Sequence, residues 1–109
     1  MKSTKRVRLG AHGWRVGSAA EFLELTPEEA AFVETKLALS RCVRRRRAAQ
    51  NVSQAALAKR LKSSQSRVAK MEAADATVSV DLLLRALFAL GAKRRDIAVA
   101  IQKGLTAAA

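Results

Sequence analysis

Residues 53–72, which decide the fold, read SQAALAKRLKSSQSRVAKME. Ser53 and Ser64 each precede a short run in which apolar residues recur at helical spacing, so both serines are predicted to cap helices. The positions expected to face inward are Leu57, Ala58, Leu61, Val68 and Met71. The stretch therefore predicts two short helices joined by about three residues, with a polar outer face on the second.

Further helices are predicted on both sides of this pair. Thr26 with Glu29 forms a capping box around Pro27, which predicts a helix from Pro27 to about Gln50, ended by Asn51. Ser79 predicts the start of a fourth helix that Gly91 ends, and residues 95–104 predict a last short helix before a frayed end at 105–109. Together these signals predict an all-α bundle of about five helices, in which residues 53–72 form a helix-turn-helix.

Residues 1–26 form a predicted N-terminal extension to the helix-turn-helix domain, which is predicted to span 27–109. Residues 1–12 are basic and lack periodicity, so disorder is expected there. Residues 13–17 predict a short edge strand, and Ser18 with Glu21 predicts a short helix that runs through Leu25.

The charge of the chain favours a polyanionic partner. Lys and Arg number 21 against 9 acidic residues, which gives a formal net charge of +12. No acidic residue occurs between Glu34 and Glu72, whereas many cations do, including the four arginines at 44–47. We interpret this segment as a surface that meets phosphates; the alternative is an ordinary basic face in contact with solvent. Arg44 and Arg45 are predicted to contact DNA phosphates whatever the base sequence.

Several other classes of protein are disfavoured. Cys42 is the single cysteine and His12 the single histidine, so we expect no disulfide, no metal site, no cofactor and no enzyme activity. The most apolar stretch, Leu82 to Leu90, is interrupted by Arg85 and is too short for a membrane span. We expect a cytoplasmic, nucleoid-associated protein.

The stretch from Leu39 to Gly91 resembles the Cro/C1 (Xre) class of helix-turn-helix proteins, on the strength of SQAALAKRL at 53–61 and SQSRVAKME at 64–72. The resemblance implies binding to double-stranded DNA, with Gln54 on a phosphate and Arg67 on a phosphate or a guanine. It assigns to base edges Ser64, Gln65, Ser66, Ala69 and Lys70. Gln65 is the first candidate for specificity, because an amide pairs with adenine at two atoms.

The same resemblance implies an ion pair between Arg47 and Glu72 that joins the first long helix to the recognition helix. Three positions depart from the family pattern. Lys62 stands where a turn glycine is usual, Arg46 stands at a position that is more often apolar, and Ala73-Ala74 replaces Asn-Gly. These departures leave the geometry of both turns open.

The N-terminal segment resembles antitoxins of the HigA type, through GWRVG at 13–17, EFL at 21–23 and TPEE at 26–29. That resemblance implies neutralisation of a RelE- or HigB-like mRNA-cleaving toxin and repression of the shared operon, with Trp14 and Phe22 as toxin contacts or, equally, as residues that pack on the first long helix. The net charge of +12 counts against it, because antitoxins of basic toxins tend to be acidic. Two alternatives remain: a stand-alone repressor whose N-terminal segment serves dimerisation alone, and a non-specific basic protein that binds RNA or membranes.

A homodimer is expected to read a near-palindromic operator, with recognition helices about 34 Å apart. The residues predicted at its interface are Ile97, Ile101 and Leu105.

Overall fold

The computed structural model describes residues 24–108, with side chains up to residue 103. This part of the chain contains helices and no strand. The helices are α3 (Pro27–Ala49), α4 (Gln54–Arg60), α5 (Gln65–Glu72), α6 (Val80–Ala89) and α7 (Arg94–Ala108). The prediction of an all-α helix-turn-helix bundle is confirmed. The strand predicted at 13–17 and most of the short helix after Ser18 lie outside the described residues.

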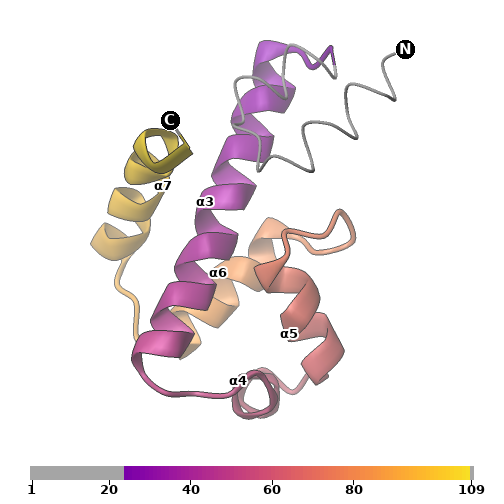
Figure 1. The fold of residues 1–109 in the computed structure, drawn as a ribbon, viewed down its shortest axis with the longest axis vertical. Helices are drawn as coiled ribbons and strands as arrows, with labels where there is room; N and C mark the ends of the chain where they lie inside the picture. The colour runs from indigo at the N-terminus through magenta and orange to yellow at the C-terminus, as the bar shows by residue number, and fades with distance from the viewer. Residues whose placement is uncertain (1–23, 109) are drawn as a thin grey trace.

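The long helix α3 is the axis around which the other helices are arranged. Figure 1 shows α7 along one side of α3, α5 on the other side, and α4 below the C-terminal end of α3. One core joins all five helices, because each of them contributes buried apolar side chains to it. Its largest fully buried apolar side chains are Leu39, Val43, Leu57, Val68, Met71, Leu83 and Leu87. The predicted inward positions of α4 and α5 belong to this core or, for Leu61, pack against it.

Side-chain caps fix where the helices begin. Thr26 accepts a hydrogen bond from the amide of Glu29 at 3.1 Å and donates its own amide to the Glu29 carboxylate at 2.8 Å. Ser53, Ser64 and Ser79 each accept the amide three residues on, at 3.0–3.2 Å. Each cap satisfies an amide that has no partner within the helix. The four predicted starts are therefore confirmed.

A residue in the left-handed conformation follows the C-terminal cap of each of these four helices. Asn51, Lys62 and Ala74 have φ values of 57°, 54° and 55°, and Gly91 has φ 83°. Asparagine and glycine tolerate this conformation, whereas lysine and alanine pay a steric penalty of about 1 kcal/mol each. Lys62 and Ala74, which stand where the family pattern has glycine, therefore adopt the glycine-like backbone conformation and lower the stability of the domain.

The C-terminal predictions need correction. α7 runs from Arg94 to Ala108, beyond the predicted 95–104 and into the segment predicted to fray. One glycine costs a helix interior only about 1 kcal/mol, so Gly104 does not end a helix that packs on α3. Ile97, a predicted dimer contact, is only 7% exposed because it faces the core of its own chain. Ile101 is 37% exposed, and the side chain of Leu105 is outside the described residues.

Candidate nucleic-acid interface

A tight turn fixes the angle between α4 and α5. The amide of Lys62 donates to the carbonyl of Lys59 at 3.1 Å, and the amide of Ser63 donates to that of Ala58 at 2.8 Å. The side chain of Ala58 is 3% exposed, so α4 packs closely against its neighbours at this position. The turn and this close packing hold α5 with one face against the core and the other toward solvent.

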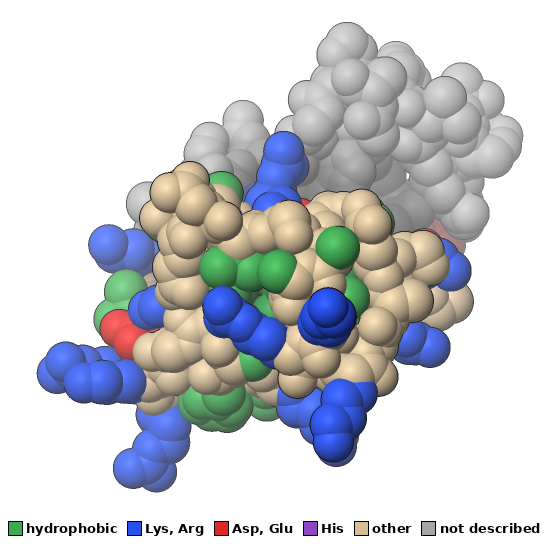
Figure 2. Space-filling model, turned by 90° about the horizontal axis from the view of Figure 1, so that it is seen from below, with side chains coloured by type: hydrophobic (Ala, Val, Ile, Leu, Met, Phe, Trp, Pro, Cys, Tyr) green, Lys and Arg blue, Asp and Glu red, His purple; other side chains and the backbone are tan. Residues whose placement is uncertain are grey.

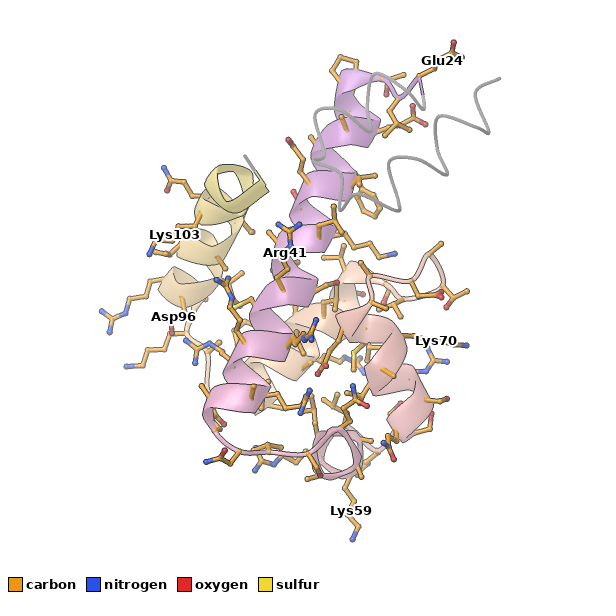
Figure 3. The ribbon with its side chains drawn as sticks, viewed as in Figure 1. Glu24, Arg41, Lys59, Lys70, Asp96 and Lys103 are labelled. Atoms are coloured by element: carbon orange, nitrogen blue, oxygen red, sulfur yellow. The ribbon has the colours of Figure 1, made fainter. Side chains whose placement is uncertain are left out.

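The outer face of α5 carries the residues predicted to read bases. Val68 and Met71 are fully buried. Successive residues are about 100° apart around a helix, so the opposite face is centred on Ser66, with Ala69 and Lys70 beside it. Figure 3 shows Lys70 pointing outward from α5. All three of these side chains are exposed.

Gln65 and Arg67 lie on opposite edges of this outer face and are both exposed. The hydroxyl of Ser64 differs from these groups, because it accepts the amide of Arg67 at 3.2 Å as the helix cap and lies 3.5 Å from the Ser66 hydroxyl. Ser64 is therefore engaged in holding the helix start, whereas Gln65, Ala69 and Lys70 project from the helix into solvent.

Arg47 joins α3 to the end of α5. Its guanidinium donates to both carboxylate oxygens of Glu72, to Oε1 at 2.9 Å, and donates to the carbonyl of Val52 at 2.9 Å. The amide of Gln54 adds a hydrogen bond to Glu72 at 3.1 Å. This network contains the ion pair implied by the resemblance, and it also holds Gln54, a predicted phosphate contact, by one of its N–H groups.

The carboxylate of Glu72 is held in its charged form. Burial by itself would raise its pKa, but hydrogen bonds from Arg47 and Gln54, together with the positive charges of Arg47 and Arg44, lower the pKa below the ordinary glutamate value. The hydrogen bond to Glu72 raises the pKa of Arg47 in turn. Both groups are therefore charged near neutral pH, as an ion pair requires.

The four consecutive arginines of α3 are divided between two sides of the domain. Arg44 and Arg47 line a concavity with Gln54, Ala69 and Glu72, next to α5. Arg45 and Arg46 instead line the groove between α3 and α7, where Arg46 pairs with Asp96 at 3.1 Å. On each side one arginine is ion-paired, and the other is exposed without an ion pair within the described residues. Arg44 and Arg45, both predicted to contact phosphates, therefore line different concavities, and only that of Arg44 lies next to α5.

Positive charge nevertheless covers the end of the molecule formed by α4. Figure 2 shows Lys and Arg side chains spread over this end, with acidic side chains visible only near its margin. Lys59 points outward from α4 on the side of the domain away from the N-terminal end of α3 (Figure 3).

Two charged residues that lie near these surfaces, Asp96 and Arg85, were not identified from the sequence. Asp96 satisfies the unusual Arg46, and Arg85 lies on α6 beside Arg67. The available signal for Arg85 was a cation that interrupts the apolar run from Leu82 to Leu90.

The remaining residues singled out from the sequence add no further site within the described residues. Trp14, Phe22 and His12 lie outside the described residues. Cys42 is buried against the core, as expected of a small apolar side chain. Within residues 24–108 no group of His, Cys, Asp or Glu could hold a metal ion. No helix in the same part of the chain has the length and apolar character needed to cross a membrane.

Comparison with protein families matches residues 38–100 to a family described as a helix-turn-helix domain. The match spans more than half of the chain and contains α4, α5 and α6 in full. Comparison with curated proteins and with solved structures gives no match.

Proposed function

Because this chain belongs to the helix-turn-helix domain family, we propose that it is a transcriptional regulator that places α5 in the major groove of double-stranded DNA. The observation that carries the proposal is the division of α5 into two faces. Val68 and Met71 are fully buried, while the opposite face is polar, exposed and next to unpaired positive charge. A major groove admits a helix with such an outer face.

Base recognition falls to the outer face and its Gln65 edge. The amide of Gln65 suits adenine, which offers an acceptor and a donor to the major groove. Lys70 suits a guanine or a phosphate, and the methyl group of Ala69 suits contact with thymine. Ser66 adapts to either base type, and Ser64 contributes through the helix start that it caps.

Phosphate contact beside this edge falls to Gln54 and Arg44. Arg44 is exposed and lies next to α5, and the second N–H of the Gln54 amide is left for a phosphate oxygen. Arg47 is assigned a structural role, since each of its three side-chain nitrogens donates a hydrogen bond to Glu72 or Val52. Arg45 faces α7 and is left out of the proposed interface.

The proposed regulator acts as a homodimeric repressor on a near-palindromic site. Because Ile97 is buried within its own chain, the interface on α7 has to use other residues. Val99 and Ile101 are 48% and 37% exposed, and they are the large apolar side chains of α7 that remain accessible in the described part of the helix.

The narrower proposal is an antitoxin that binds an mRNA-cleaving toxin through residues 1–26 and represses its own operon. It rests on the likeness of GWRVG at 13–17 and TPEE at 26–29 to HigA-type antitoxins. The acidic residues Glu28 and Glu29, at the exposed start of α3, suit a basic toxin. The alternative is a repressor with no toxin partner.

The DNA-binding proposal is tested by selecting a preferred site from random duplexes with the full chain, then measuring Gln65→Ala on it. We expect binding weaker by roughly 1–3 kcal/mol and one relaxed base position. Gln102→Ala is the matched control, because Gln102 is an exposed glutamine on α7. If no preferred site emerges, or if Gln65→Ala keeps the wild-type preference, the placement of α5 in the groove is refuted.

The antitoxin proposal is tested by capture from native cells with the full chain and with a Trp14→Ala/Phe22→Ala variant. A small basic RNase held by the wild type and lost by the variant supports the proposal and its binding site. The same RNase held by both supports an antitoxin with a different contact. DNA binding without any protein partner leaves the stand-alone repressor.

A further inference from the structure

A second concavity lies beside α5, on the side away from Arg44 and Gln54. It has a volume of about 400 Å³ and is lined by the turn after α4, by α5 and by α6. Its charged side chains are Lys62 from the turn, Arg67 from α5, and Asp81 and Arg85 from α6. Three separate elements therefore bring three cations and one carboxylate to the same place.

Within the described residues, the three cations have no ion-pair partner. Lys62, Arg67 and Arg85 are all exposed, and none forms an ion pair or a side-chain hydrogen bond within the described residues. Arg46 and Arg47, in contrast, both have a carboxylate. Asp81 offsets one of the three positive charges, so the concavity keeps an excess of two. Like charges held together in this way favour an anion between them.

The position of this concavity relative to α5 indicates which anion. Arg67 lies on one edge of the outer face of α5, and the concavity with Arg44, Gln54 and Ala69 lies along the other edge. The major groove of B-DNA is about 12 Å wide and is bounded by one sugar-phosphate backbone on each side. A helix in that groove thus has one strand along each of its edges.

We infer that Lys62, Arg67 and Arg85 bind a backbone phosphate of the DNA strand opposite to the one that Arg44 and Gln54 contact. The two concavities then hold α5 between the strands and fix its depth and register, while the outer face reads bases. Arginine suits this role, because its planar fork donates two hydrogen bonds to one phosphate. The inference rests on the proposed function and extends it to a second strand.

The test compares Arg85→Gln and Lys62→Gln with the wild type on the selected site and on an unrelated duplex, between 50 and 200 mM salt. One lost phosphate contact makes the slope of log affinity against log salt shallower by about 0.9. When the salt rises fourfold, from 50 to 200 mM, the affinity of the wild type should therefore fall by a factor about 3.5 times larger than the affinity of each variant does. The loss of affinity at low salt should be similar on both duplexes, since a phosphate carries no sequence information.

Two controls accompany these variants. Arg95→Gln removes an exposed arginine from α7 and should leave the slope unchanged. Asp81→Asn removes the carboxylate from the concavity and should strengthen binding to both duplexes. Unchanged slopes for Arg85→Gln and Lys62→Gln would overturn the inference, even if the wild type binds its site as proposed. A wild type with no preferred site refutes the proposed function instead.

Ethylation of single phosphates in the selected site identifies the strand. Ethylating the contacted phosphate should weaken the wild type but have little further effect on Arg85→Gln, and that phosphate should lie on the strand opposite to the one found with Arg44→Gln. Both variants responding to the same strand would overturn the inference.

Titration of inorganic phosphate into the full chain tests whether the concavity binds a free ligand instead. Millimolar binding lost in Arg85→Gln, with an unchanged DNA slope, would assign the concavity to a soluble phosphate compound and also overturn the inference.

Discussion

Breaking the ion pair between Arg47 and Glu72 should cost more stability than breaking any other polar contact described between α3 and α5. The side chains are only 17% and 6% exposed. Arg47→Met removes the donors to Glu72 and Val52 and leaves the carboxylate nearly buried, with Gln54 as its remaining partner. Breaking a buried pair by removing one member costs about 3–5 kcal/mol, and the slight exposure here places the expected loss near the lower end, about 3 kcal/mol.

Removing both partners should cost much less than the two single changes together. A pair of methionines of similar volume leaves no buried charge, so Arg47→Met/Glu72→Met should lie within about 1 kcal/mol of the wild type. The single change Glu72→Met leaves a charged Arg47 that is partly accessible and should cost about 2 kcal/mol. The cycle then gives a coupling energy of about 4 kcal/mol, a large fraction of the 5–15 kcal/mol expected for a whole domain.

Urea unfolding of the full chain at pH 7 measures each free energy, with Arg45→Met as a control for loss of an exposed arginine from the same helix. Because the pKa of Glu72 is lowered in the folded state, the stabilisation should be complete above the ordinary glutamate pKa and should fade as pH falls through the lowered value. Single changes that each cost under about 1 kcal/mol and simply add would refute the reasoning.

Three further predictions follow from single positions. Arg44→Ala should lower the salt slope of DNA binding by about 0.9, whereas Arg45→Ala, one residue away but facing α7, should not; equal slopes in titrations of both would contradict the placement of the two side chains. Ala74→Gly should raise the free energy of unfolding by about 0.5–1 kcal/mol, because φ is 55° there, and a loss of stability in urea would argue against that backbone. Ser40→Ala should also stabilise the protein, by about 1 kcal/mol in thermal or urea unfolding, because the buried Ser40 hydroxyl has no hydrogen-bond partner within the described residues.

The helices of this domain were predictable because their signals are local. A cap needs only a side chain and an amide three residues on, so Thr26, Ser53, Ser64 and Ser79 mark helix starts without knowledge of the fold. The left-handed conformation of Asn51 is local in the same sense. The C-terminal helix was less predictable, because packing against α3 decides its length and outweighs one glycine.

The surroundings of the candidate site depend on distant parts of the chain and could not be read from the sequence. Helical periodicity places Ile97 on an apolar face, but it does not say whether that face meets the same chain or a second copy. Likewise, the sequence of four consecutive arginines does not show which of them form ion pairs with acidic residues. Asp96 is 50 residues beyond Arg46, and only the position of α7 brings the two together. Arg85 is comparable, since the turn after α4 gives it its neighbours.

The arginine run also limits how the length of this chain can change. Deleting any one codon of 44–47 yields the same protein, three arginines between Val43 and Ala48, and a composition that looks almost unaltered. Within a helix, however, the loss of one residue rotates everything before it by about 100° relative to everything after it. If the last arginine still paired with Glu72, Leu39 and Val43 would rotate out of the core. If Leu39 and Val43 stayed buried, no arginine would be in the position from which Arg47 pairs with Glu72. The repetitive segment should therefore tolerate replacement of Arg45 far better than the loss of any single arginine.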